Sequence, residues 1–332
     1  MSAAANAESV TGRGLPRPVV ARRAARLFSL DAWYHGLLTA LALVVFAVVA
    51  LIVYEAARGA GPSLRQFGWR FLITTEWDPV AEKFGALPYV YGTLVSSALA
   101  LLLAVPVGLG TAVYLAELAP HRVGDAVSFV VELLASIPSI IYGMWGIFVL
   151  APWLRGLVEP WLVKHLGFLP LFQGFPFGIG MLNAGIVLAI MIVPTIVAIS
   201  REILLSTPQS FREASLALGS TRAEAIGVTL EAARPGILGA VILALGRALG
   251  ETMAVTMVIG NTNRMSPSLL APGATMASVI ANEFTEATGR LHLSALIEIA
   301  LLLFVVTLCV NGAARLLVYW VTGGRRDVAA AV

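Results

Sequence analysis

The sequence predicts an all-α membrane protein, a polytopic bundle of about six transmembrane helices, from three observations. Hydrophobic residues make up 58% of the 332-residue chain and charged residues only 12%, about half of the charged share of a soluble domain. The mean hydropathy is +0.87. Six stretches are also apolar over about 20 residues, the length that crosses the hydrocarbon core of a bilayer. A water-facing surface cannot be built from this composition.

The six apolar stretches give the expected spans. Pro106, Pro138 and Pro194 fall inside them, and a proline frees a backbone carbonyl and bends a helix. In a membrane such breaks are tolerated where neighbouring helices or a polar cavity satisfy the freed groups. The pattern is therefore typical of kinked helices that line a path. The expected spans are residues 37–57, 90–115, 127–151, 182–199, 237–259 and 295–319.

Positive charge before the first span indicates the orientation of the chain. Five arginines precede that span, with no acidic residue between Glu8 and Asp31. Clustered positive charge stays in the cytoplasm, and six spans return the carboxyl terminus to the same side. Arg22-Arg23 before an apolar run also resembles a twin-arginine export signal, but this run is too long for one. The five arginines are Arg13, Arg17, Arg22, Arg23 and Arg26.

The expected organisation has three parts. Residues 1–35 form an arginine-rich cytoplasmic tail, which anionic lipid attracts. Residues 36–322 form the transmembrane domain, with a cytoplasmic hairpin at residues 206–234. Residues 323–332 form a second cytoplasmic tail.

Several kinds of site are excluded by the sequence. The single cysteine, Cys309, rules out a disulfide framework and a cysteine metal site, and the four histidines are scattered. A phosphate-binding P-loop needs a serine or threonine directly after its lysine. Phe84 and His165 follow the only two lysines. We therefore expect no nucleotide bound through such a loop and no metal. We also expect no nucleic-acid partner.

The segment between the fourth and fifth spans predicts two helices joined at a glycine. Thr207 and Pro208 are typical of an N-cap and a first helical position. Gly219 is a natural helix stop, and Thr221 with Glu224 forms a capping box that starts the next helix. A simple linking hairpin fits this pattern, and so does a short helix seated in a groove of a partner.

The same segment resembles the cytoplasmic E-A-A-x-x-x-G loop of the permease subunits of bacterial ABC importers. The resemblance implies a type I importer architecture and a short helix that grips an ATPase on another chain. Leu230 is followed here by Glu231, where the family often has proline. The residues expected to contact the ATPase are Glu213, Ala214, Ser215, Leu216, Ala217, Leu218 and Gly219.

Two charged residues, Arg247 and Glu251, stand inside the otherwise apolar fifth span. Residues four apart share a helix face, so the two side chains are expected to reach each other or a common ligand. Arginine offers a planar fork of donors that matches phosphate or sulfate. We hypothesise that Glu251 accepts a proton-bearing P–OH and repels fully ionised sulfate. A structural ion pair is the alternative. Glu132 and Glu298, also at membrane depth, line the path or lie near an interface.

Residues 246–255, with the sequence G-R-A-L-G-E-T-M-A-V, resemble the signature of PstC-type phosphate permeases. The sister permease of such transporters typically reads G-E-T-A-P-L where this chain has G-E-T-M-A-V. The transport-linked arginine and glutamate of the family fall on Arg247 and Glu251. The resemblance runs from Trp77 to Val318. Further matching stretches are residues 77–79, 84–88, 91–95, 136–143 and 193–195.

This resemblance implies the partners as well as the role. We expect a pore shared with a PstA-type sister permease. We also expect a dimer of PstB-type ATPases carrying ATP and Mg, and an extracytoplasmic PstS-type phosphate-binding protein. The chain itself would be no enzyme and would carry no cofactor, and it would lie in the bacterial inner membrane with both termini in the cytoplasm.

Three other readings remain open from the sequence. An ABC permease for sulfate or molybdate differs in its solute but not in its mechanism. An ion-driven secondary transporter usually shows internal repeats, and none is clear here. A receptor or scaffold without a transport role leaves unexplained why Arg247 and Glu251 are kept at membrane depth, where a charge has a high energetic cost.

Overall fold

The structure, a computed structural model, describes residues 20–321. In this range the chain is helical, with isolated bridges in place of β-strands. Six helical segments of this range are long and apolar enough to cross a membrane, which confirms the predicted helical membrane architecture. They are Trp33–Gly59, Leu87–Leu118, Ser139–Leu166, Met181–Ser206, Arg222–Leu249 and Arg290–Trp320.

The chain divides into two units, one ending at Glu55 and the other beginning at Ala56. Most of α1 (Val20–Gly59), which carries the first span, belongs to the first unit. Residues 20–35 of the predicted arginine-rich tail are helical and open α1. Residues 1–19 and the predicted second tail, residues 323–332, lie outside the described residues.

The second unit is built around two helices that pack along each other, α3 (Leu87–Val113) and α8 (Met181–Ser206). Small residues allow their close approach, as is common between membrane helices. A Cβ added at Gly108 of α3 would lie 2.8 Å from Ile196 of α8, and one added at Gly185 of α8 would lie 2.5 Å from Leu99. The bundle therefore depends on glycine at these contacts.

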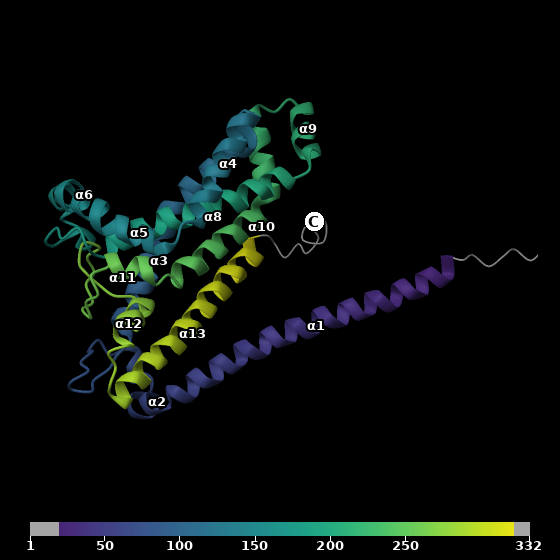
Figure 1. Ribbon diagram of the computed structural model, residues 1–332. Coiled ribbons are helices and arrows are strands. Elements are labelled where there is room, and N and C mark those ends of the chain that lie inside the picture. Colours follow the sequence, from purple (N-terminus) through teal and green to yellow (C-terminus); the bar gives the residue numbers. More distant parts are fainter. Residues whose placement is uncertain (1–19, 322–332) are drawn as a thin grey trace, which may run out of the picture. The chain divides into compact units, whose positions relative to one another are not determined.

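The remaining helices of the second unit surround this pair. Figure 1 shows α13 (Arg290–Val321) running beside α10 (Arg222–Leu249), and α9 (Gln209–Ala217) at one end of α8 and α10. The other helical elements are α2 (Gly61–Phe67), η1 (Gly68–Leu72), η2 (Tyr114–Leu118), α4 (His121–Ser136), α5 (Ser139–Trp145), η3 (Gly146–Leu150), α6 (Ala151–Trp153), η4 (Leu154–Val158), α7 (Glu159–Leu166), η5 (Pro170–Phe172), α11 (Met253–Val258) and α12 (Met276–Glu283).

The third span differs from the predicted residues 127–151. α4 ends at Ser136, and Ile137 is extended, with φ −65° and ψ 129°. Pro138 is the physical reason, because the residue before a proline is driven out of the helical region. The membrane-length helix then begins at Ser139 and continues to Leu166, through α5, α6, α7 and the π-helical turns η3 and η4.

A buried cluster joins the segment after η1 to α12 and α13. Trp77 Nε1 donates to Glu283 Oε2 over 2.8 Å, and His292 Nε2 lies 2.9 Å from the same oxygen. The ring of Phe84 stacks on that of His292 and meets the edge of Trp77. Asp78 Oδ1 accepts from two backbone N–H groups just downstream, which closes the turn after Trp77.

The contact of Gly92 with the segment before α12 generates a test of this packing. A Cβ at Gly92 would lie 2.1 Å from the carbonyl oxygen of Ala274, and backbone cannot yield as a side chain can. We expect Gly92→Ala to lower the free energy of unfolding by about 1–3 kcal/mol, the usual cost of overpacking. The measurement is thermal denaturation of the purified protein in detergent.

Gly110→Ala is the matched control for that variant. Gly110 lies on the same helix, and a Cβ there would meet nothing within 4 Å. Alanine is the better helix former by about 1 kcal/mol, so this variant should be neutral or slightly stabilised. Equal melting temperatures for the two variants would contradict the contact.

Candidate functional site

A break in the fifth span separates the two charged residues predicted to form a site. α10 ends at Leu249, and α11 begins only at Met253. Gly250, with no side chain to favour the helix, and Thr252, with φ −110° and ψ −64°, lie in between. Arg247 and Glu251 therefore do not share one continuous helix face, which corrects the sequence prediction. Within residues 20–321 no ion pair joins them.

Arg247 is half-buried in the last turn of α10 and turns toward α8. Its Nη1 donates to Thr195 Oγ1 over 3.2 Å. Thr195 directly follows Pro194, inside the enclosed fourth span. An arginine has five N–H donors, and within the described chain only this one bond uses them. The guanidinium is thus neither buried in a dry contact nor fully exposed, and it keeps donors for a ligand.

Glu251 lies at the other side of the break and has a different contact. Its Oε1 accepts from the backbone N–H of Ala254 over 3.2 Å, as a capping residue does at the start of a helix. α11 itself packs closely against α5 and η3: a Cβ added at Gly143 of α5 would lie 2.8 Å from Met257, and one added at Gly146 of η3 would lie 2.7 Å from Val258. The carboxylate is therefore held near the break by α11, while α10 holds the guanidinium.

Two polar residues beside the last turn of α10, Thr195 and Asn311, have no role assigned from the sequence. Thr195 lies in residues 193–195, a stretch that resembles the PstC-type permeases but has no role assigned to it from the sequence. Asn311 of α13 lies beside Gly246, 3.7 Å from where a Cβ would be, and its buried Oδ1 has no hydrogen-bond partner among the described residues. A polar side chain inside an apolar run was the available signal for Asn311.

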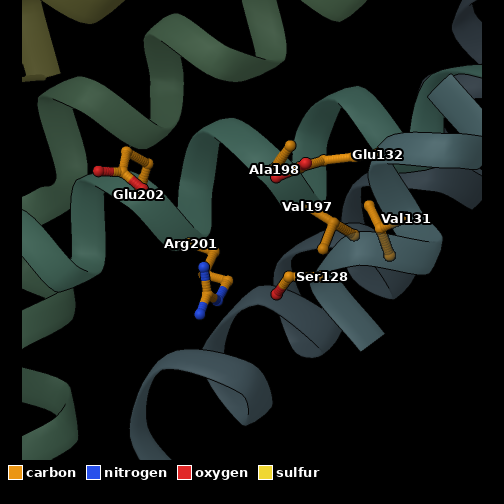
Figure 2. Close-up of a pocket in the computed structure, with 7 residues that line it drawn as sticks. All are labelled: Ser128, Val131, Glu132, Val197, Ala198, Arg201 and Glu202. Carbon is orange, nitrogen blue, oxygen red and sulfur yellow. The ribbon is translucent and has the colours of Figure 1, made fainter. Parts of the chain in front are cut away.

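Glu132 belongs to a different place, a pocket between α4 and α8. Figure 2 shows Glu132 on α4 and Arg201 on α8 among its lining residues. Arg201 Nη2 also lies 3.4 Å from Asp125 Oδ1 of α4. The pocket holds about 30 Å³, roughly one water, and its two carboxylates disfavour an anion. Its lining residues are Ser128, Val131, Glu132, Val197, Ala198, Arg201 and Glu202.

Glu298 is likewise separate from Arg247. It is 5% exposed and lies one turn after Ser294 on α13. Ser294 Oγ donates to the Gly59 carbonyl over 2.9 Å and accepts from Ser63 N over 3.0 Å. Glu298 precedes Asn311 by thirteen residues, about 20 Å along the helix. It therefore faces the junction with α2 rather than the break in the fifth span.

The hairpin between the fourth and fifth spans has the predicted two helices. Gly219 follows α9 with φ +87°, and Thr221 and Glu224 form the capping box of α10. One detail differs, since Thr207 does not cap α9. Its Oγ1 donates to the Ile203 carbonyl and closes α8, because Pro208 occupies the N-cap position of α9.

The motif residues of the hairpin are mostly open to solvent. Within residues 213–219, Ser215 alone is buried. Three apolar side chains in and beside the motif, Phe211, Leu216 and Leu218, are 47%, 44% and 88% exposed. Apolar side chains gathered on an exposed short helix are typical of a surface that binds a partner.

Comparison with known proteins gives consistent relationships. Residues 104–323 match the family described as binding-protein-dependent transport system inner membrane component. The phosphate transport system permease protein PstC of Mesorhizobium japonicum is 46% identical over 296 residues, 87% of this chain and 90% of that protein. The PstC of Xylella fastidiosa strain 9a5c is 48% identical over 294 residues, 86% of this chain and 90% of that protein.

Solved structures share the fold at lower identity. A bacterial alginate ABC transporter, in complex with a pentasaccharide-bound periplasmic protein, contains a chain with a TM-score of 0.59 and 17% identity, covering 88% of this chain and 97% of that one. A chain of the MetNI methionine ABC transporter in an inward-facing conformation has a TM-score of 0.52 and 21% identity. The match covers 70% of this chain and 94% of that one. These likenesses extend to the fold alone.

Proposed function

Because this chain belongs to the binding-protein-dependent transport system inner membrane components, and within them to the PstC phosphate permeases, we propose that it forms half of the path of an ATP-driven phosphate importer. It is a multi-pass protein of the inner membrane and a permease subunit, so it is not itself the catalyst of ATP hydrolysis.

The observation that carries the proposal is the state of Arg247. A charge at membrane depth is costly and is retained where it faces a bundle interior or a wet cavity. The guanidinium is half-buried beside a helix break, and one hydrogen bond to Thr195 fixes it. Its remaining donors suit the oxygen atoms of phosphate, which a planar fork binds in pairs.

Glu251 supplies a basis for selectivity in the same proposal. One carboxylate oxygen is engaged by Ala254, while the other has no partner among residues 20–321. Phosphate at neutral pH still carries a proton that a carboxylate can accept, whereas sulfate carries none and is repelled. We therefore assign Glu251 the role of favouring phosphate over sulfate as the solute passes the break.

The partners follow from the family and from α9. We propose that a PstB-type ATPase dimer, which binds ATP and Mg, receives α9, that a PstA-type permease completes the path, and that a PstS-type protein delivers phosphate. The exposed surface of residues 213–219 supports the ATPase contact. α9 and both termini then lie in the cytoplasm, as the arginines before the first span indicate.

The other readings of the sequence are less well supported. A sulfate or molybdate permease would share the fold, but the curated relatives at 46% and 48% identity are phosphate permeases. An ion-driven carrier would need no ATPase, and the family match to binding-protein-dependent transport systems favours an ATP-driven importer.

Reconstituted uptake tests the role of Arg247. In proteoliposomes that hold the complete transporter, Arg247→Ala should lower ATP-dependent phosphate uptake at least about tenfold, because a hydrogen bond to a charged group contributes about 1.5–3 kcal/mol. Arg247→Lys keeps the charge without the planar fork and should fall in between. Uptake by Arg247→Ala at the wild-type rate would exclude this arginine from the path.

Competition between anions tests the role of Glu251. Glu251→Gln keeps the size of the side chain but removes its charge, so sulfate should no longer be repelled. We expect the preference for phosphate over sulfate to fall by about tenfold, equivalent to about 1.4 kcal/mol. The measurement is uptake of labelled phosphate against increasing sulfate. An unchanged uptake rate together with an unchanged preference would end this assignment.

Substitution of Gly219 tests the ATPase contact. Its φ of +87° is strained for a β-branched residue, at a cost of about 1–3 kcal/mol. Gly219→Val should therefore misplace α9 and uncouple ATP hydrolysis from uptake while the membrane helices stay intact. Gly219→Asn, which tolerates this backbone conformation, is the control and should stay coupled. Normal coupling in both variants would count against α9 as the ATPase contact.

A further inference from the structure

The short helix α9 is tied to the membrane helices by a side chain that turns inward. Most of residues 213–219 are exposed, but Arg212, directly before them, is half-buried. Its Nη2 donates to Oε1 of Glu117. Glu117 lies 95 residues earlier in the chain, so this ion pair is no local consequence of the hairpin.

The position of Glu117 makes the ion pair costly to break. Glu117 belongs to η2, the π-helical turn that ends α3, and its side chain is only 3% exposed. A buried carboxylate that loses its partner remains as an uncompensated charge. Its neighbour Ala116 packs against a buried cluster formed by α3, α8 and α10. η2 is therefore anchored in the bundle at one side and to α9 at the other.

The ion pair gives α9 a third attachment to the bundle. Along the chain, α9 is joined to α8 before it and to α10 after it. The bond from Arg212 adds α3, which packs along α8 at Gly108 and Gly185. α8 in turn carries Thr195, the partner of Arg247. A displacement of α9 thus acts through η2 on the end of α3, and α3 packs along α8, the helix that carries the hydroxyl partner of Arg247.

We propose that the Glu117–Arg212 ion pair is a positioning contact of transport, through which movement of α9 is passed into α3. The inference rests on the proposed function, since it requires α9 to be the part that the ATPase moves. Neither residue touches phosphate or nucleotide in this account. π-Helical turns often occur at functional positions, and η2 ends α3 where the helix meets this contact.

The test measures phosphate uptake and ATP hydrolysis together in proteoliposomes holding the complete transporter. Glu117→Gln removes the charge at nearly constant size. We expect the phosphate moved per ATP hydrolysed to fall by about tenfold, within the range of measured couplings between sites. Asp125→Asn is the matched control, because its ion pair joins α4 to Arg201 of α8 without involving α9. It should keep the wild-type ratio.

A charge exchange tests the pair rather than each residue. Glu117→Arg combined with Arg212→Glu restores the attraction with reversed signs, and it should recover most of the ratio lost in each single reversal. If the transporter with the reversed pair does not assemble, Arg212→Lys is measured instead. Lysine keeps the positive charge, so this variant should retain most of the ratio.

Two results would overturn the proposal. One is a wild-type ratio in Glu117→Gln. The other is a parallel fall in uptake and hydrolysis, which is expected if the ion pair only stabilises the fold. Uptake by the wild-type transporter tests the proposed function apart from the ion pair. If the wild type takes up no phosphate with ATP, the proposed function fails, and this inference fails with it.

Discussion

The structure depends on how one guanidinium is accommodated inside a bundle with little polar surface. Arg247 cannot be solvated by hydrocarbon. α10 ends two residues after it, and the chain passes through a short non-helical segment before α11. Thr195 supplies a hydrogen bond from the neighbouring helix, and Glu251 is held nearby by the start of α11. Discontinuous helices that place polar groups at mid-membrane recur in transporters, and here the discontinuity brings three elements to one place.

Close packing of small residues fixes the helices around the break beside Arg247. Without a hydrophobic force between helices in lipid, association depends on shape and van der Waals contact. Gly108 and Gly185 let α3 and α8 approach, while Gly143 of α5 and Gly146 of η3 let these two elements approach α11. Glycines thus set the spacing of the helices that position Arg247, Thr195 and Glu251.

The sequence was sufficient for the fold but not for the geometry of the site. Long apolar runs reveal spans because each must cover the same hydrocarbon thickness, and the glycine and capping box of the hairpin act locally. Two breaks were not predicted as breaks. The apolar pattern predicts a kink at Pro138, where the helix instead ends, and a continuous helix through Gly250, where α10 stops. The ion pair of Glu117 with Arg212 joins residues distant in sequence, and no local pattern contains that information.

The cluster around Trp77 also constrains the order in which the protein is completed. The indole of Trp77 emerges from the ribosome about 200 residues before Glu283 and His292. Synthesis proceeds at roughly 5–20 residues per second, so this segment waits some ten seconds or more for its partners. During that interval Trp77 and Phe84 lack the contacts from α12 and α13 that they have in the finished protein. The final span is therefore the step that closes the molecule, and a truncated chain lacking it would leave its earliest loop unfinished.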